Sequence, residues 1–428
     1  MRNSVNNFWI KITDHSSFTG QVSLVMTANL VIAVLGLVTG VISARILGPA
    51  GRGELAAIQT FPSFIASVAM LGMPEAVVFF SSQKPRKAGE FLASALAVVT
   101  IFLIPIYGLG WFLLPSLLKA QQPQVLMAAR IYMAGVMIAY VSNGIPHQLL
   151  RAVGSWRSWN LIRILPNAIW LITLVFALIL PRLANPTKVS LIYIAGQWLI
   201  LLPTWILVKK RLTQPYQVNP QNFRPMLTYG LPAALSLVPQ TLNLRMDQIL
   251  MAAFLAPAHL GQYVVAVSWS AAASPILNSV GPVLFPSLGA LSDPAKQVKL
   301  LNTVVPRFSA LALAVTIAIV IITPTMIPLL FGEQFRQAIV PAIILIFANA
   351  ILSMNTLFGD ALKGIGLTGK VLTADLTGLV ATTVLLLILI PRYGITGAAI
   401  ASLVVYSFVC LMLGYFIRSQ YKNIDRSI

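Results

Sequence analysis

The 428-residue sequence is poor in the residues from which most active sites are built. It contains one cysteine, Cys410, three histidines and ten acidic residues. A single cysteine excludes an intramolecular disulfide. The sequence has no glycine-rich phosphate-binding loop and no histidine or cysteine cluster with metal-ligand spacing. We therefore expect no ATP-driven work, no catalysis, no cofactor and no metal site.

Charged residues are also scarce, and those of one sign dominate. Only 9% of the residues are charged, 58% are hydrophobic, and the 29 basic residues outnumber the ten acidic ones to give a net charge of +19. The mean hydropathy of +0.86 is higher than a soluble domain needs for its core and indicates a bilayer protein. The basic residues lie mostly in short loops between apolar stretches, so they indicate membrane orientation and not nucleic-acid binding.

Long apolar stretches predict an all-α polytopic membrane protein with about twelve transmembrane helices. A spanning helix needs roughly 20 apolar residues, and six such stretches occur in each half of the chain. The first begins near Gln21 and is too long for the apolar region of a cleavable signal peptide. The predicted spans are 21–43, 54–80, 89–114, 123–146, 158–180, 189–208, 225–254, 259–286, 301–323, 335–357, 368–390 and 394–417.

These spans predict two lobes of six helices each. The N-lobe covers residues 21–208, a cytoplasmic linker covers 209–224, and the C-lobe covers 225–417. Residues 1–20 are expected to form a segment that lies in the membrane interface, with a disordered tail as the alternative. Residues 418–428 are expected to form a cytoplasmic tail.

The distribution of basic residues predicts how the chain is oriented. Lys and Arg accumulate in cytoplasmic loops. With the N-terminus inside, 20 of the 29 basic residues fall on the inner side, eight fall on the outer side, and Arg245 lies within a span. We therefore expect a multi-pass protein of the plasma (inner) membrane with both termini in the cytoplasm.

Two short motifs recur at nearly one offset. The pattern Leu-x-Pro-Ala-x-x-Gly of residues 47–53 returns 208 residues later at residues 255–261. The turn 151–154, Arg-Ala-Val-Gly, matches the turn 363–366, Lys-Gly-Ile-Gly, at an offset of 212. Repeats in chain order indicate two halves with one architecture. Because each half has six spans, the halves form a parallel repeat about a pseudo-two-fold axis, with a cavity expected between them.

The span 225–254 carries an unusual number of polar residues. Arg245 and Asp247 lie about 15 and 12 Å from its outer end at 1.5 Å per residue. Charge at such depth is costly and marks a functional candidate. Side chains spaced three or four residues apart share one helix face, which should not face lipid. Ser236, Gln240, Asn243 and Asp247 share one face, and Thr241, Arg245 and Gln248 form an adjoining face. The candidates for binding the substrate in the lumen are Gln240, Asn243, Arg245 and Gln248.

Several charged residues are candidates for binding or coupling. The planar, permanently charged guanidinium of Arg245 suits a phosphate or pyrophosphate. Asp247 is a candidate for cation or proton coupling, because a desolvated carboxylate can titrate. Structural ion pairs with other helices are the alternative for both residues. Glu75 and Asp375 have two open interpretations, gating or coupling on the one hand and capping a neighbouring helix on the other.

Arg45 and Arg52 flank a turn rich in glycine and proline at the predicted outer mouth. An anion-attracting rim that contributes to substrate binding is one interpretation, and anchoring to lipid headgroups is the other. The second copy of this turn has His259 and Leu260 where the first has Gly51 and Arg52, so the rim charge is expected on one side only.

The turn Ala-Arg-Ile-Leu-Gly-Pro-Ala-Gly-Arg-Gly-Glu-Leu at 44–55 resembles the first outer loop of Wzx-type polysaccharide and O-antigen flippases. These proteins belong to the multidrug/oligosaccharidyl-lipid/polysaccharide (MOP) exporter superfamily. The stretches 149–160, 246–263, 330–335 and 362–366 are similar to the same family, so the resemblance covers nearly the whole chain.

This resemblance implies a MATE-like, V-shaped bundle of two six-helix lobes. It implies a flippase that moves a polyprenyl-pyrophosphate-linked oligosaccharide from the inner to the outer leaflet by alternating access, for polysaccharide or O-antigen biosynthesis. It implies coupling to an H⁺ or Na⁺ gradient, although the few deep acids leave the ion unassigned. The implied partners are the glycan-lipid, membrane lipids, a polysaccharide polymerase and a chain-length regulator.

Two other functions fit parts of the sequence. A MATE-like, cation-coupled multidrug or small-molecule antiporter would share the fold, but it usually carries organic cations, which suit a lumen with Arg245 and few acids poorly. A membrane glycosyltransferase or polymerase would need acidic catalytic residues in an extended outer loop, and the outer loops here are short.

Overall fold

The structure, a computed structural model, describes residues 18–212, 216–278 and 293–425, together with positions 280, 281, 284, 288 and 291. Every regular element in these ranges is a helix. The expected interfacial segment at residues 1–20 lies almost wholly outside the described residues.

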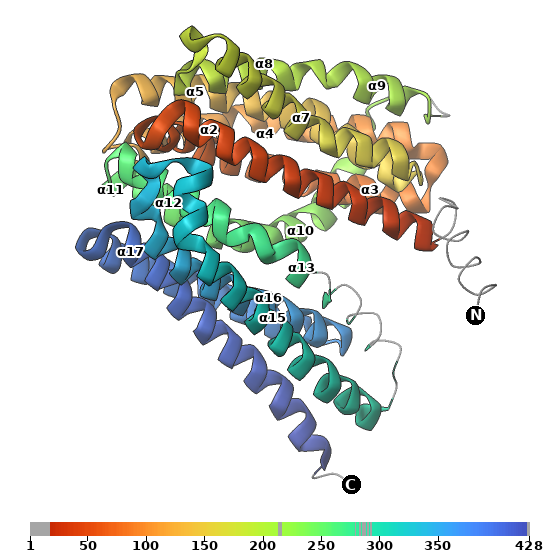
Figure 1. Ribbon diagram of the computed structural model, residues 1–428. Coiled ribbons are helices and arrows are strands. Elements are labelled where there is room, and N and C mark those ends of the chain that lie inside the picture. Colours follow the sequence, from red (N-terminus) through yellow and green to blue (C-terminus); the bar gives the residue numbers. More distant parts are fainter. Residues whose placement is uncertain are drawn as a thin grey trace, which may run out of the picture. The chain divides into compact units, whose positions relative to one another are not determined.

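The first half of the chain forms helices α2 to α9, connected by short turns (Figure 1). A π-helical turn, Tyr140–Gly144, separates α5 from α6. The helices are α2 (Phe18–Ala69), α3 (Met73–Gln83), α4 (Ala88–Leu117), α5 (Pro123–Ala139), α6 (Ile145–Ala152), α7 (Trp156–Ile179), α8 (Pro186–Leu199) and α9 (Leu201–Lys209).

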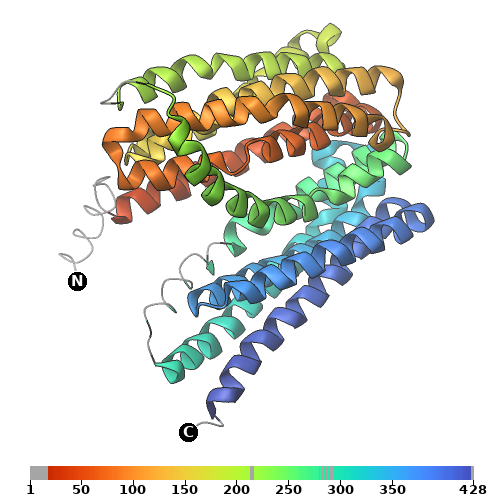
Figure 2. The same ribbon diagram turned by 180° about the vertical axis from the view of Figure 1, so that it is seen from behind.

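The second half forms helices α10 to α17. Figure 2 shows α15, α16 and α17 running alongside one another. The helices are α10 (Phe223–Asn243), α11 (Met246–Phe254), α12 (Pro257–Ser270), α13 (Ser274–Leu277), α15 (Pro294–Phe331), α16 (Ile339–Gly364) and α17 (Thr368–Asp425).

Within the described residues, eight helical runs are long and apolar enough to cross a bilayer. Two of them, Ser23–Gln83 with 61 residues and Thr368–Gln420 with 53, are long enough to cross twice. Each breaks at a glycine in the left-handed region, Gly48 at φ 65° and Gly394 at φ 57°. The break at Gly48 falls in the predicted loop between residues 43 and 54, and the break at Gly394 falls at the first residue of the predicted span 394–417. The prediction of an all-α multi-pass membrane protein is confirmed.

Two spans that the sequence predicts as continuous are interrupted in the structure. The span 54–80 breaks before Pro74, where Gly72 adopts φ 68° and α3 begins. The span 225–254 breaks at Leu244 and Arg245, between α10 and α11. The first break follows from glycine conformation and from the lack of a proline N–H. The second has no such sequence signal.

The chain forms two compact units that do not coincide with its two halves. Unit 1 comprises Ile58–Leu118, Gln122–Val238 and the described part of Met1–Thr39. Unit 2 comprises Gly40–Ala57, Lys119–Gln121 and the described part of Pro239–Ile428. The glycine- and proline-rich turn of the first half therefore packs within unit 2.

Each unit has its own apolar core. In unit 1, fully buried side chains from α3, α4 and α6 meet, among them Met73, Leu92 and Leu149. In unit 2, one cluster joins α15 and α16 through Phe308 and Leu357, and a second joins α16 and α17. Many large apolar side chains are exposed on the long helices, as expected for helices that face lipid.

Both repeated motifs have repeated geometry. Gly53 packs against the carbonyl of Pro257, and Gly261 packs against the carbonyl of Pro49, so closely that a Cβ at either glycine would overlap the oxygen. The two copies of Leu-x-Pro-Ala-x-x-Gly therefore contact each other reciprocally inside unit 2. A reciprocal contact of this kind is what a pseudo-two-fold axis through the motif produces.

The second repeated motif ends two helices in the same way. Gly154 and Gly366 have φ of 72° and 83°. The N–H of Ser155 donates to Leu150 O at 2.8 Å, and the N–H of Leu367 donates to Leu362 O at 2.8 Å. A glycine with positive φ, followed by a residue whose N–H donates to the carbonyl five residues earlier, is the Schellman motif that ends many helices.

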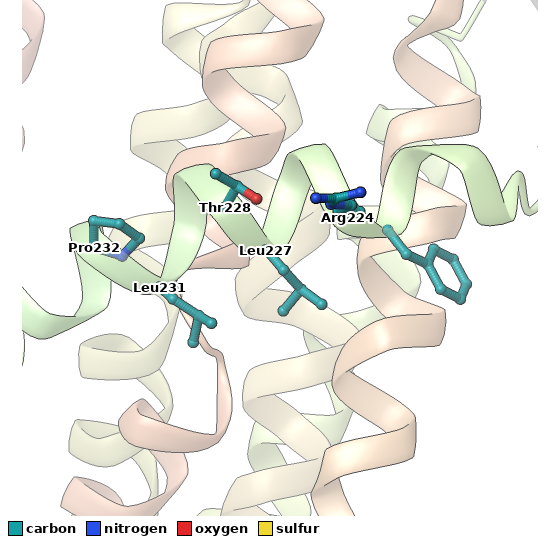
Figure 3. A pocket seen from close by; sticks show the side chains of 6 residues that line it. Arg224, Leu227, Thr228, Leu231 and Pro232 are labelled. Carbon is teal, nitrogen blue, oxygen red and sulfur yellow. The ribbon is translucent and has the colours of Figure 1, made fainter.

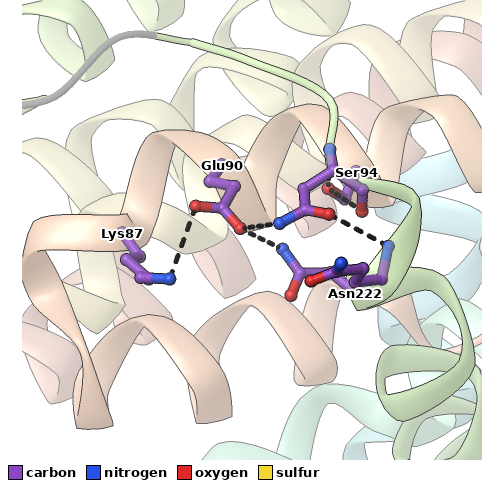
Figure 4. A network of polar contacts seen from close by, with 6 residues as sticks. Lys87, Glu90, Ser94 and Asn222 are labelled. Atoms are coloured by element: carbon purple, nitrogen blue, oxygen red, sulfur yellow. Dashed lines mark hydrogen bonds and ion pairs between the residues drawn. The ribbon is translucent and has the colours of Figure 1, made fainter.

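A polar network fixes the end of the linker to unit 1. The Glu90 carboxylate accepts from the amides of Asn219 and Asn222 at 2.7 and 2.8 Å. The Ser94 hydroxyl exchanges hydrogen bonds with the backbone of Asn219 (Figure 4). The turn that leads into α10 is therefore anchored to α4.

Candidate functional site

Arg245 occupies the break between α10 and α11. It has φ −128° and ψ −10°, outside the helical region, and its side chain is exposed. Breaking a helix at membrane depth frees backbone groups that need other partners, which is tolerated where the backbone lines protein or water. The structure therefore presents the guanidinium predicted from sequence at an interruption in the polar helix.

Arg52 lies close enough to Arg245 for the two positive charges to repel each other. The Nε of Arg52 is shielded from solvent and has no hydrogen-bond partner among the described residues. Unit 2 thus holds two guanidiniums near each other, one of them with a buried, unused donor. Placing like charges together costs free energy unless an anion compensates them.

Asp247 is buried in the first turn of α11, two residues after Arg245. Its Oδ2 accepts from the Tyr263 hydroxyl at 2.6 Å, and its Oδ1 accepts from the backbone N–H of Gln248 at 2.7 Å. Arg245 is within electrostatic reach of the carboxylate. A carboxylate in the first turn of a helix also interacts favourably with the helix dipole.

Arg45 binds backbone carbonyls of unit 2. Its Nε and Nη2 donate to Leu330 O and Leu329 O at 2.7 and 2.5 Å. These oxygens belong to the last turn of α15. A cation there donates hydrogen bonds to carbonyls that have no partner within the helix, and it interacts favourably with the helix dipole. Arg45 therefore ties the Gly48 turn to the end of α15.

The predicted polar face of α10 and α11 is split by the break. Asn243 Oδ1 accepts from the Thr382 hydroxyl at 2.6 Å and so connects α10 to α17. Gln248 is buried beside Asp247. The side chain of Gln240, also a predicted binding residue, lies outside the described residues.

The other two predicted coupling residues lie far along the chain from Asp247. Glu75 is in the first turn of α3 in unit 1, with Arg151 as its electrostatic neighbour. Asp375 is in α17 in unit 2, with Lys363 as its electrostatic neighbour. No group of three or more His, Cys, Asp or Glu side chains suited to a metal ion occurs in the described ranges.

A groove of about 550 Å³ runs along one face of α10 in unit 1 (Figure 3). Its lining is apolar except for Arg224 and Thr228. None of the predicted site residues lines it; Arg224 was expected only as one of the basic residues that set orientation. The remaining lining residues are Phe223, Leu227, Leu231 and Pro232.

Sequence reasoning missed the partners of two predicted residues, Tyr263 for Asp247 and Thr382 for Asn243. These contacts span 16 and 139 residues along the chain. Neither has a local signal, because the helix packing that creates them is not encoded in spacing within one helix.

Comparisons with known proteins agree with this architecture. Residues 19–292 match the family model described as polysaccharide biosynthesis protein. The probable low-salt glycan biosynthesis flippase Agl15 of Haloferax volcanii is 23% identical over 385 residues, which cover 88% of this chain and 78% of that protein. The succinoglycan biosynthesis transport protein ExoT of Rhizobium meliloti is 23% identical over 372 residues, 82% of this chain and 69% of that protein.

Solved structures show the same fold. The lipid II flippase MurJ in an inward closed conformation superposes with a TM-score of 0.77 and 16% identity, covering 92% of this chain and 87% of that one. An inward-facing multidrug resistance MATE family transporter of the MOP superfamily superposes with a TM-score of 0.71 and 16% identity, covering 91% and 96%. The family match covers more than half of the chain, and the fold is that of MOP-superfamily transporters. The chain belongs to the polysaccharide biosynthesis protein family.

Proposed function

We propose that this protein is a flippase that moves a polyprenyl-pyrophosphate-linked oligosaccharide from the inner to the outer leaflet by alternating access. It acts as a transporter and not as an enzyme, and it supplies glycan units to polysaccharide assembly. A polysaccharide polymerase and a chain-length regulator are its proposed partners.

The arginine pair in unit 2 is the observation that carries this proposal. Arg245 is exposed at a helix break, and Arg52 beside it has a buried Nε without an acceptor among the described residues. A pyrophosphate offers several anionic oxygens and can accept from two guanidiniums at once. Binding the diphosphate would relieve the repulsion between the arginines.

The groove along α10 supports the lipid part of the proposal. An isoprenoid chain needs an apolar surface in contact with the bilayer, and the groove supplies one with Arg224 at the first turn of the helix. A cation at a helix N-terminus is unfavourable for the helix dipole, so this arginine does not stabilise α10. A phosphate of the lipid is a partner that would compensate it.

A cation-coupled multidrug antiporter is the second candidate, because MATE transporters share the fold. Its cargo chemistry differs. Organic cations need acidic or aromatic surroundings, whereas the exposed charge at the helix break is positive. The charge of the site therefore favours an anionic cargo.

The test is export of the glycan by variants of Arg245. We expect Arg245→Ala to reduce export at least tenfold, and Arg245→Lys to retain part of it, because a point charge still attracts phosphate but loses the bidentate geometry. Export is measured as cell-surface polysaccharide, with the amount of protein in the membrane measured in parallel.

Arg392→Ala is the matched control, because Arg392 is an exposed arginine of unit 2 outside the arginine pair. It should export as the unmodified protein does. Normal export by Arg245→Ala would remove the arginine pair from the mechanism, and uptake or efflux of organic cations without any effect on surface glycan would favour the antiporter.

A further inference from the structure

Unit 1 contains a second arginine pair that plays no part in the site described above. The guanidinium of Arg163 lies 4.4 Å from the ring centroid of Trp159, and that of Arg151 lies 5.5 Å from the same ring. Both ring distances are within the range of cation–π attraction. The two guanidinium carbons are therefore within about 10 Å of each other. The ring holds both cations in place.

No carboxylate neutralises this pair at ion-pair distance in the part of the chain that the structure describes. The ion pairs found there join Lys87 to Glu90, Arg336 to Glu333 and Lys363 to Asp360. Glu75 influences Arg151 only at longer range. Arg151 and Arg163 repel each other, and His147 also lies within electrostatic reach of Arg163.

Neighbouring polar groups hold Arg163 in a fixed orientation. Its Nη1 donates to Asn160 Oδ1 at 3.1 Å and its Nη2 donates to Asn29 Oδ1 at 2.8 Å. Asn29 lies on α2 and Asn160 on α7, two helices that run side by side in unit 1 (Figure 1). Both acceptors are neutral amides, so the charge of Arg163 remains uncompensated.

The shared ring also has an unused donor. Trp159 is 8% exposed, and its Nε1 is buried without a hydrogen-bond partner among the described residues. Buried indole N–H groups normally find an acceptor. Two guanidiniums beside one ring and one unpaired N–H are donors that a phosphate can use.

The position of this cluster determines which phosphates reach it. Arg151 is exposed at the end of α6, and Arg163 lies about 10 Å along α7 from its first residue at 1.5 Å per residue. The cluster thus extends from the membrane surface to below it, on the side that the charge pattern predicts to be cytoplasmic. A headgroup phosphate carried by a lipid occupies this depth.

We propose that Arg151, Arg163 and Trp159 form a binding site for a lipid-borne phosphate in unit 1, distinct from the arginine pair of unit 2. The source is either the diphosphate of the glycan-lipid, which then docks here before it reaches Arg52 and Arg245, or the phosphate of a bilayer phospholipid. The first of these sources rests on the proposed function, and the existence of the site does not.

The experiment uses the full-length protein in micelles of an alkyl maltoside detergent, which contributes no phosphate group. The probe is polyprenyl diphosphate in one arm and phosphatidylglycerol in the other. The readout is the part of the tryptophan fluorescence that Trp159→Phe removes, which reports this ring alone among eight tryptophans. It is insensitive to binding at Arg52 and Arg245.

We expect saturable titration of this signal in at least one arm, with a midpoint at least tenfold higher in Arg151→Gln and in Arg163→Gln. Arg157→Gln should titrate as the unmodified protein does, because Arg157 is exposed in the first turn of α7, has no cation–π contact with the Trp159 ring within the described residues, and its loss changes the net charge equally. Arg151 is exposed, so its variant keeps the fold even where Arg163→Gln loosens the contact with α2.

The outcomes separate this site from the proposed function. Equal midpoints in Arg151→Gln, Arg157→Gln and the unmodified protein, or no saturable signal with either lipid, would overturn the site and leave the flippase proposal standing. A response to phosphatidylglycerol alone would keep the site as a phospholipid site and count against the passage of the glycan-lipid through it.

Discussion

At the residue scale, Asp247 is the candidate whose surroundings differ most from a solvent-exposed acid. It is buried and has one side-chain donor, the Tyr263 hydroxyl at 2.6 Å, in addition to a backbone N–H. Tyr263 is itself fully buried. The hydrogen bond therefore connects α11 to α12, and Asp247 is also a buried acid within electrostatic reach of Arg245.

We predict that Asp247→Asn slows transport driven by a cation gradient, because the amide cannot bind and release a proton or replace a carboxylate as a cation ligand. Transport into vesicles is measured with the gradient present and collapsed.

Tyr263→Phe should lower the free energy of unfolding by about 1 to 3 kcal/mol, since it leaves the buried carboxylate short of a donor.

Glu333→Gln is the control for Asp247→Asn, because Glu333 is a surface acid with a 72% exposed side chain. It should respond to the gradient as the unmodified protein does. If the unmodified protein transports its substrate equally fast with and without the gradient, no such coupling exists, whatever the role of Asp247 in stability.

At the element scale, the reciprocal contact of the two Leu-x-Pro-Ala-x-x-Gly motifs fixes how α2 meets α12. Each glycine is placed where a side chain would strike a carbonyl of the other motif. Backbone approach this close requires a residue without a Cβ. Arg45, next to the first motif, adds hydrogen bonds to the end of α15, and Gln121, between α4 and α5, adds hydrogen bonds to the end of α11.

We predict that Gly53→Ala and Gly261→Ala each destabilise unit 2 by about 1 to 3 kcal/mol, the usual cost of overpacking. Gly36→Ala is the control in the same helix, because a Cβ there meets no atom within 4 Å. It should be neutral or slightly stabilising.

The stability of the three alanine variants is measured by thermal unfolding of the detergent-solubilised proteins. A Gly53→Ala protein that melts at the temperature of Gly36→Ala would show that the two motifs are not packed backbone against backbone.

At the scale of the whole molecule, the charge pattern predicts one orientation in the membrane. The exposed Arg86 lies between α3 and α4, at a predicted inner loop, and the exposed His259 lies in the second copy of the repeated turn, which is predicted to be outside. Loops on opposite sides should differ in their access to reagents that do not cross the bilayer.

The single cysteine makes this test simple. Cys410→Ser gives a cysteine-free background. In that background we predict that a membrane-impermeant maleimide labels His259→Cys in intact cells and labels Arg86→Cys only after permeabilisation. Labelling of Arg86→Cys alone in intact cells would reverse the topology, whereas labelling of both variants after permeabilisation is the control for reactivity.

The sequence by itself determined the helical membrane class, the family and the repeat, and it predicted Arg245 as a candidate binding residue. Apolar length, loop charge and recurring motifs are local properties, and the bilayer turns them into spans because it leaves backbone groups no partner outside a helix or a closed barrel. Proline and glycine likewise predicted the turn at Gly48, whereas the break at Gly72 interrupts a span that was predicted as continuous.

Only the tertiary structure decided which residues meet. The break at Arg245, the Tyr263 bond to Asp247, the Arg45 contact with α15 and the hydrogen bond from Arg163 to Asn29 all join segments distant in sequence or depart from regular helix geometry. Such contacts depend on how helices pack, and the hydrophobic pattern of one helix specifies its buried face without naming the side chains that lie opposite.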